Sequence, residues 1–105
     1  RVHHKVLAAI LEKMEAHVEK PLGRHDMARF AGISERHLDR LFAGEMKSGF
    51  QKEYLRIRLE RARTLLKQSS MKISEIALAC GFAGPSQFAR AFRMQYGENP
   101  TATRK

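Results

Sequence analysis

Apolar residues recur every three to four positions along almost the whole chain, and no stretch alternates apolar and polar residues for long enough to predict a strand. An all-α fold of about seven helices is therefore expected. The first helix ends before Pro21, because the residue before a proline disfavours helical geometry. A short helix then covers Arg24 to Ala31. Gly23 is its expected N-cap, and Gly32 ends it because glycine tolerates the positive φ of a tight turn.

The same signals divide the rest of the chain. Ser34 is expected to cap a third helix that turns Leu38, Leu41, Phe42 and Met46 inward. Further helices are predicted at about Phe50–Gln68 and Ile73–Cys80, from Gly84-Pro85 through Gln95, and as a final turn capped by Asn99. The longest of them is expected to carry a basic outer face of Arg56, Arg58, Arg61, Arg63 and Lys67.

The chain matches itself at a shift of about fifty residues. Ala28 and Gly32 correspond to Ala77 and Gly81 at a shift of 49, and one residue is inserted in the second copy around Gly84. At a shift of 50, the triplet Leu38, Arg40 and Phe42 corresponds to Phe88, Arg90 and Phe92. Both copies consist of a short helix, a glycine, an apolar residue, a short turn and a second helix.

This repeat predicts two helix-turn-helix units, residues 1–49 and 69–105, joined by a linker helix over 50–68. The glycines permit a tight turn, Ile33 and Phe82 fill the corner, and each second helix presents a basic face that fits the major groove. At about 1.5 Å per residue the linker spans about 28 Å, close to the roughly 34 Å between successive major-groove faces. The alternative is a repeated helical hairpin used only for packing, with solvated arginines.

Charge favours the nucleic-acid interpretation. Lysine and arginine total 20 against 11 acidic residues, which gives a net charge of +9 and an isoelectric point near 10.3. Such a balance fits a polyanionic partner, either nucleic acid or an anionic membrane surface. A membrane-surface or partner-binding module is the competing function, because the 50–68 helix is basic and amphipathic. The apolar stripe of that helix is, however, needed to join the two halves.

Other function classes lack support in the sequence. Cys80 is the only cysteine and is expected to be inert core, so no disulfide framework or thiolate metal cluster is expected. The histidines show no spacing that gathers three metal ligands, and no phosphate loop or nucleophile-elbow motif is present. Signal peptide and membrane span are also lacking. We expect no enzyme, no cofactor and no metal site, and a cytoplasmic, nucleoid-associated protein.

Three stretches resemble the AraC/XylS family of bacterial transcription regulators, and the resemblance covers roughly Val6 to Arg104. Ile73-Ser-Glu-Ile-Ala-Leu-Ala-Cys-Gly-Phe82, followed by Ser86-Gln-Phe-Ala-Arg-Ala-Phe92, Gly97 and Pro100, is similar to the signature segment of that family. Arg58-Leu-Glu-Arg-Ala-Arg63 resembles its linker helix, and Ser34 to Phe42 its first recognition helix.

The resemblance implies seven helices in two homeodomain-like subdomains and binding to double-stranded DNA near promoters, usually as an activator that contacts RNA polymerase. Most members carry a separate N-terminal effector or dimerisation domain, which fits the abrupt start at Arg1 without an initiator Met. We therefore expect a piece of a longer protein. The isolated domain should be a monomer, and the full-length protein can dimerise through that domain, which resembles an amidotransferase fold in the most similar members.

By position, the base-reading side chains implied by the family are Arg36, Asp39, Arg40, Ser86, Gln87 and Arg90. Candidate phosphate contacts are Ser34, His37, Lys47, Ser48 and Arg93. Two departures concern the start of the linker helix, because members usually have Gly in place of Lys47 and often Pro in place of Phe50. Pro85 and Ala89 also remove hydrogen bonds that larger or polar residues would offer, so the second unit is expected to read fewer bases.

Single residues leave alternatives open. Arg40 and Arg90 can each grip guanine O6 and N7 through two hydrogen bonds, or else contact a phosphate or only solvent. Asp39 is unexpected on a helix that faces phosphates. It either accepts a hydrogen bond from cytosine N4 or orients Arg36 or Arg40. Gln87 either reads adenine or holds a phosphate.

Overall fold

The computed structural model describes residues 2–105, with side chains from His4 onwards. Over this range it contains seven α-helices, one π-helical turn and no strand, which confirms the all-α prediction. The elements are α1 (Val2–Ala16), α2 (Arg24–Ala31), α3 (Glu35–Leu41), η1 (Phe42–Met46), α4 (Phe50–Gln68), α5 (Ile73–Ala79), α6 (Pro85–Tyr96) and α7 (Pro100–Arg104). The observed bounds of α2 and α4 are those that the glycines and the apolar periodicity predict.

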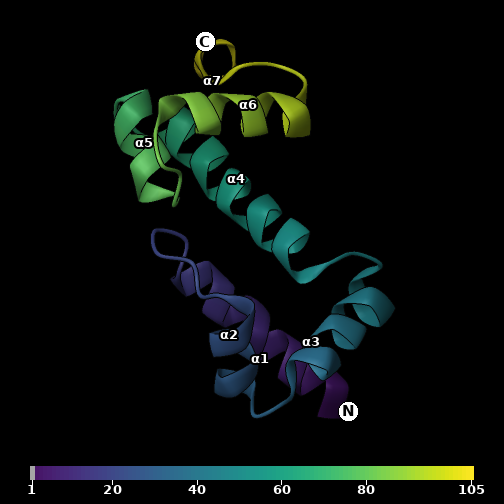
Figure 1. The fold of residues 1–105 in the computed structure, drawn as a ribbon. Helices are drawn as coiled ribbons and strands as arrows, with labels where there is room; N and C mark the ends of the chain where they lie inside the picture. Colours follow the sequence, from purple (N-terminus) through teal and green to yellow (C-terminus); the bar gives the residue numbers. More distant parts are fainter. Residues whose placement is uncertain (1) are drawn as a thin grey trace. The chain divides into compact units, whose positions relative to one another are not determined.

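The chain forms two compact units. The N-terminal unit contains the chain up to His17 together with Pro21–Leu55, and the C-terminal unit contains Val18–Lys20 and Arg56–Lys105. Helix α4 therefore contributes its first residues to the N-terminal unit and the rest to the C-terminal unit. Figure 1 shows α2 and α3 following one another in the first unit, and α5 and α6 in the second.

The N-terminal unit is built around side chains that are almost completely buried. They are Ile10 and Met14 of α1, Met27 and Ala28 of α2, Leu38 of α3, and Phe42, Phe50 and Tyr54. The ring of Phe50 lies edge-on to those of Phe42 and Tyr54, with centroids 5.5 and 5.6 Å apart. The Tyr54 hydroxyl donates to the carbonyl of His17 at 2.5 Å and accepts from the amide of Leu22 at 3.1 Å. This hydroxyl fixes the path of the chain between α1 and α2.

The C-terminal unit packs around a row of aromatic rings. Phe82, Phe88, Phe92 and Tyr96 follow one another with centroids 5.3, 5.6 and 4.7 Å apart. Around them lie the buried aliphatic and small side chains Leu59, Ala62, Leu66, Ile76, Ala77 and Cys80. Arg104 of α7 closes this unit, since its guanidinium donates to the carbonyls of Leu66 and Met71 at 3.0 and 2.6 Å.

The third helix differs from its prediction. Regular α-helix ends at Leu41, and the chain continues as a π-helical turn to Met46, which is only half-buried. Gly44 lies within that turn, and glycine is a weak helix former. The turn ends at Lys47, whose φ of 56° makes it the only non-glycine residue with positive φ among the residues described.

The structural repeat extends beyond the residues that match in sequence. From Glu35 to Met46 and from Pro85 to Tyr96 the two second helices have the same length at a shift of 50. Each is followed by a left-handed residue, Lys47 with φ 56° and Gly97 with φ 80°. Lys47 therefore occupies a position that normally takes glycine, because side chains make the left-handed conformation costly.

Candidate nucleic-acid interface

The turn between the two helices has the same hydrogen bonds in both units. In the N-terminal unit the amides of Gly32 and Ile33 donate to the carbonyls of Arg29 and Ala28, at 3.1 and 3.0 Å. This pair of bonds, with Gly32 at φ 70°, is a Schellman motif. The corner residue Ile33 is half-buried.

The C-terminal unit repeats the motif. The amides of Gly81 and Phe82 donate to the carbonyls of Leu78 and Ala77, at 3.1 and 2.9 Å, and Gly81 has a φ of 84°. Here the corner residue Phe82 is buried. The inserted residue follows the turn, so the second helix starts differently in the two units.

Helix α3 starts with a side-chain cap, whereas α6 starts with a proline. The Ser34 hydroxyl accepts a hydrogen bond from the amide of His37 at 3.0 Å, as predicted. At α6 the N-cap is Gly84, and Pro85 occupies the first helical position, where a missing amide hydrogen is harmless. The side chain of Ser34 is therefore already engaged within the protein.

The candidate base-reading side chains lie on the exposed faces of these two second helices. Arg36, Asp39 and Arg40 are exposed on α3, and Ser86, Gln87 and Arg90 are exposed on α6. Residues three and four apart share one face of a helix, so Arg36 lies beside both Asp39 and Arg40. Arg90 stands likewise beside Ser86 and Gln87. The second helix of each unit thus carries an exposed cluster of three polar side chains that includes arginine.

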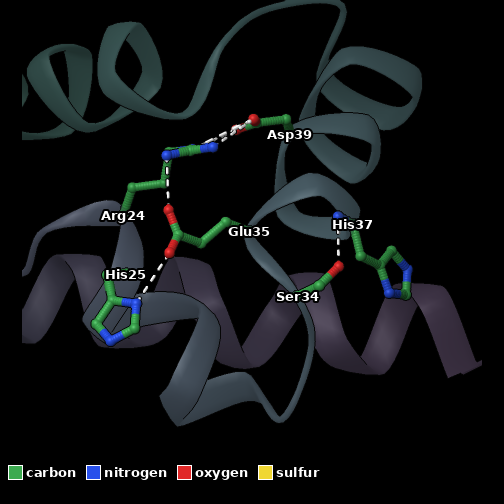
Figure 2. A network of polar contacts seen from close by, with 6 residues as sticks. All are labelled: Arg24, His25, Ser34, Glu35, His37 and Asp39. Carbon is green, nitrogen blue, oxygen red and sulfur yellow. Dashed lines mark hydrogen bonds and ion pairs between the residues drawn. The ribbon is translucent and has the colours of Figure 1, made fainter.

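Asp39 has a partner that the sequence interpretation missed. The guanidinium of Arg24, the first residue of α2, donates to both carboxylate oxygens of Asp39 at 3.0–3.2 Å and to Glu35 at 2.7 Å (Figure 2). The second oxygen of Glu35 lies 2.9 Å from Nδ1 of His25. The hydrogen bonds that Arg24 donates to Asp39 raise the pKa of Arg24. In this network the partner of Asp39 is Arg24, which lies across the turn, and not Arg36 or Arg40 on its own helix.

One signal in the sequence points to this network. Arg24 stands in the first turn of its helix, where the helix dipole disfavours a positive charge, so a nearby carboxylate is to be expected. The separation of 15 residues between Arg24 and Asp39 lies outside any helical periodicity.

The candidate phosphate contacts differ in accessibility. Lys47 and Arg93 are exposed, and His37 is half-buried. The hydroxyl of Ser48 is buried and finds no hydrogen-bond partner among the described residues. Of the five predicted phosphate contacts, Ser48 therefore has the least accessible polar atom.

Arg58 is not part of a solvated outer face, so that prediction is wrong. Its Nε and Nη2 atoms donate to the carbonyls of Cys80 and Gly81 at 2.9 and 2.8 Å. The guanidinium also lies 4.3 Å from the centroid of the Phe82 ring. Arg58 therefore caps the end of α5 and covers the corner of the second turn. Cys80 itself is buried, and this burial raises the pKa of its thiol.

No group of three or more metal-ligating side chains occurs within the described range. Over the same range, each helix is too short or too polar to cross a membrane.

Comparisons with known proteins agree on one family. A family model described as a helix-turn-helix domain matches residues 27–105. The chain is 48% identical over 103 residues to the HTH-type transcriptional regulator GlxA of Rhizobium meliloti, covering 98% of this chain and 32% of that protein. It is 34% identical over 103 residues to the HTH-type transcriptional regulator CdhR of Pseudomonas aeruginosa, covering 98% and 31%. The chain thus spans about a third of the length of these curated relatives.

Solved structures give the same answer. An AraC-type transcriptional regulator from Chromobacterium violaceum matches with a TM-score of 0.93 and 39% identity, over 96% of this chain and 90% of that one. The DNA-binding domain of the global transcriptional factor AdpA, solved in complex with a target DNA, matches with a TM-score of 0.86 and 30% identity, over 93% and 88%. The repeated glycine turns, the exposed arginines and these matches lead to one assignment: the chain belongs to the AraC-type family of helix-turn-helix domains, a family of transcriptional regulators rather than enzymes.

Proposed function

We propose that this chain binds double-stranded DNA with sequence specificity, as the DNA-binding domain of a transcription regulator, and places α3 and α6 in successive major-groove segments. The observation that carries the proposal is the repeated turn, which in each unit is followed by a helix with an exposed arginine at an equivalent position, Arg40 or Arg90. The AdpA domain, which is similar over 93% of this chain, was solved on DNA.

The competing membrane-surface function loses its main support. Such a module would need a free apolar face on α4, but Tyr54, Ile57, Leu59 and Leu66 of that helix are buried within the protein. The polar side of α4 alone is not enough for insertion among lipid chains. We therefore place duplex DNA ahead of an anionic membrane as the polyanionic partner.

The proposal assigns a role to candidate side chains of both units. Base edges are contacted by Arg36, Arg40, Ser86, Gln87 and Arg90. Phosphates are contacted by Ser34, His37, Lys47, Ser48 and Arg93. We further propose three features of the full-length protein, namely a separate N-terminal domain, activation through RNA polymerase, and a place on the nucleoid. Residues 1–49, 50–68 and 69–105 are proposed as the first unit, the linker helix and the second unit.

Salt dependence tests whether both units bind. Neutralising about six to ten phosphates gives a slope of roughly −5 to −9 in a plot of log affinity against log salt concentration. Titration of a selected duplex between about 50 and 200 mM salt measures this slope. A slope shallower than about −2 would contradict a footprint made by two units. Vesicles with anionic lipids, titrated at one of the same salt concentrations, provide the comparison with the membrane alternative.

Selection from a random duplex pool tests the two-groove arrangement. The selected site should be asymmetric, with two halves about 10 base pairs apart. Arg40→Ala should relax specificity in one half and Arg90→Ala in the other, each at a cost of about 1–3 kcal/mol in binding free energy. If both substitutions altered the same base position, the two-groove arrangement would be wrong.

A further inference from the structure

We infer that Arg24 is a positioning residue of the first recognition helix, which holds Asp39 and Glu35 of α3 so that neither carboxylate faces DNA unpaired. Asp39 then does not read cytosine; its role is to receive Arg24. This inference rests on the proposed function, because it concerns how α3 is presented to a duplex.

The geometry supports a clamp between two helices. Three hydrogen bonds of 3.0–3.2 Å join the guanidinium of Arg24 to Asp39, and one of 2.7 Å joins it to Glu35. Figure 2 shows the Arg24 side chain reaching from α2 toward both carboxylates of α3. Glu35 and Asp39 are four residues apart and lie on one face of α3. A planar guanidinium can satisfy both because its donors form a rigid fork.

The placement of the charges supports the same inference. Arg24 is the first residue of α2, where the helix dipole disfavours a positive charge. Asp39 lies in the middle of the helical segment that runs from Glu35 through the π-helical turn to Met46, beyond the turns in which the dipole acts. Arg24 therefore does not stabilise its own helix, whereas its pairing with two carboxylates across the turn offsets its placement.

The pairing with Arg24 also explains how α3 can carry two carboxylates and still approach DNA. Without Arg24, Glu35 and Asp39 would place two negative charges on the helix that approaches phosphates. With Arg24 and a protonated His25 beside Glu35, the cluster is neutral; with a neutral His25 it carries a single negative charge. The exposed arginines Arg36 and Arg40 then set the sign of the field at the surface of α3.

The test is a double-mutant cycle on DNA affinity with Arg24→Met, Asp39→Asn and the combined variant. Affinities are measured at one salt concentration for the selected duplex and for a scrambled one. We expect Arg24→Met to lower affinity for the selected duplex about tenfold, which corresponds to about 1.4 kcal/mol, and to lower affinity for scrambled DNA less. In the Asp39→Asn background the same Arg24 substitution should cost less than about threefold.

Arg29→Met serves as the matched control, because Arg29 is an exposed arginine on the same helix. It removes the same charge from α2 and is expected to change affinity by less than about twofold. Far-UV circular dichroism with thermal unfolding checks that each variant is folded. If Arg24→Met does not fold, Arg24→Lys replaces it. Lysine keeps the charge but lacks the fork, so it should still lose affinity for the selected duplex.

Two results would overturn the inference. In the first, Arg24→Met lowers affinity by the same factor with or without Asp39→Asn, and by the same factor for the selected and the scrambled duplex, and the salt slope falls by about 1. This is the behaviour of a phosphate contact. The second is a change of preference at one cytosine alone on Asp39→Asn. Failure of the unchanged protein to bind either duplex would instead contradict the proposed function, so the two failures can be told apart.

Discussion

Replacing Arg58 by methionine tests whether this arginine holds the second helix-turn-helix together. In the structure it donates to the carbonyls of Cys80 and Gly81 and lies over the ring of Phe82. Methionine keeps an unbranched apolar side chain of similar length, so it retains much of the packing while removing the charge and the donors. The substitution therefore isolates the polar contribution of Arg58 to the stability of the C-terminal unit.

The magnitude follows from three contacts. A hydrogen bond from a charged donor contributes about 1.5–3 kcal/mol, and we reduce this to about 1 kcal/mol each because Arg58 is half-buried and water can replace it at the carbonyls. A cation over an aromatic face adds about 0.5–1 kcal/mol. Arg58→Met should lower the free energy of unfolding by about 2.5–3 kcal/mol in total.

Urea unfolding followed by circular dichroism measures the change. The matched control is Lys67→Met, which removes one positive charge from an exposed position in the last turn of the same helix. A surface change of this kind is expected to stay within about 0.5 kcal/mol. If Arg58→Met unfolded at the same urea concentration as Lys67→Met, the capping role of Arg58 would be refuted.

Three further substitutions test local features. Cys80→Ala should lower the free energy of unfolding by about 1 kcal/mol or less and leave DNA affinity unchanged, as measured by denaturation and duplex titration, because a buried thiol is exchanged for a smaller side chain; weaker binding at unchanged stability would reveal a functional thiol. Since burial raises the pKa of this thiol, labelling of the native protein at neutral pH should be slow and should become fast in urea. Lys47→Gly should raise the free energy of unfolding by about 0.5–1 kcal/mol, because glycine adopts a positive φ without strain, and should lower DNA affinity because it removes a phosphate contact. A lower free energy of unfolding would show that Lys47 is unstrained. Ser34→Ala removes the cap of α3 and should cost about 1 kcal/mol in a thermal unfolding assay, with an unchanged midpoint counting against the cap.

Features set by a few neighbouring residues could be predicted from the sequence. The bounds of α2 follow from Gly23 and Gly32, and the start of α3 follows from Ser34, because a cap or a left-handed glycine acts within one turn of helix. The repeat predicted the second turn at Gly81 as well. These signals sufficed for the order of the helices.

Contacts between distant residues could not be predicted in this way. Arg58 lies 22 residues from Cys80, and a helical pattern shows only that an arginine is polar, not that it reaches a buried carbonyl. The pairing of Arg24 with Asp39 crosses a turn in the same manner. The π-helical turn at Phe42–Met46 gives no periodic signal, because it is only about one turn long and its hydrogen bonds span just one residue more than those of an α-helix.

Because the two second helices have equal lengths, each can be exchanged for the other by protein engineering. Residues 35–46 and 85–96 each lie between an extended N-cap residue and a left-handed C-cap residue, so one could be grafted in place of the other without changing a loop. The core would decide which grafts fold, since Leu38 in one segment faces inward where Phe88 does in the other. On the proposed function, a hybrid domain that carries the same recognition helix twice would select the same base sequence in both halves of its DNA target.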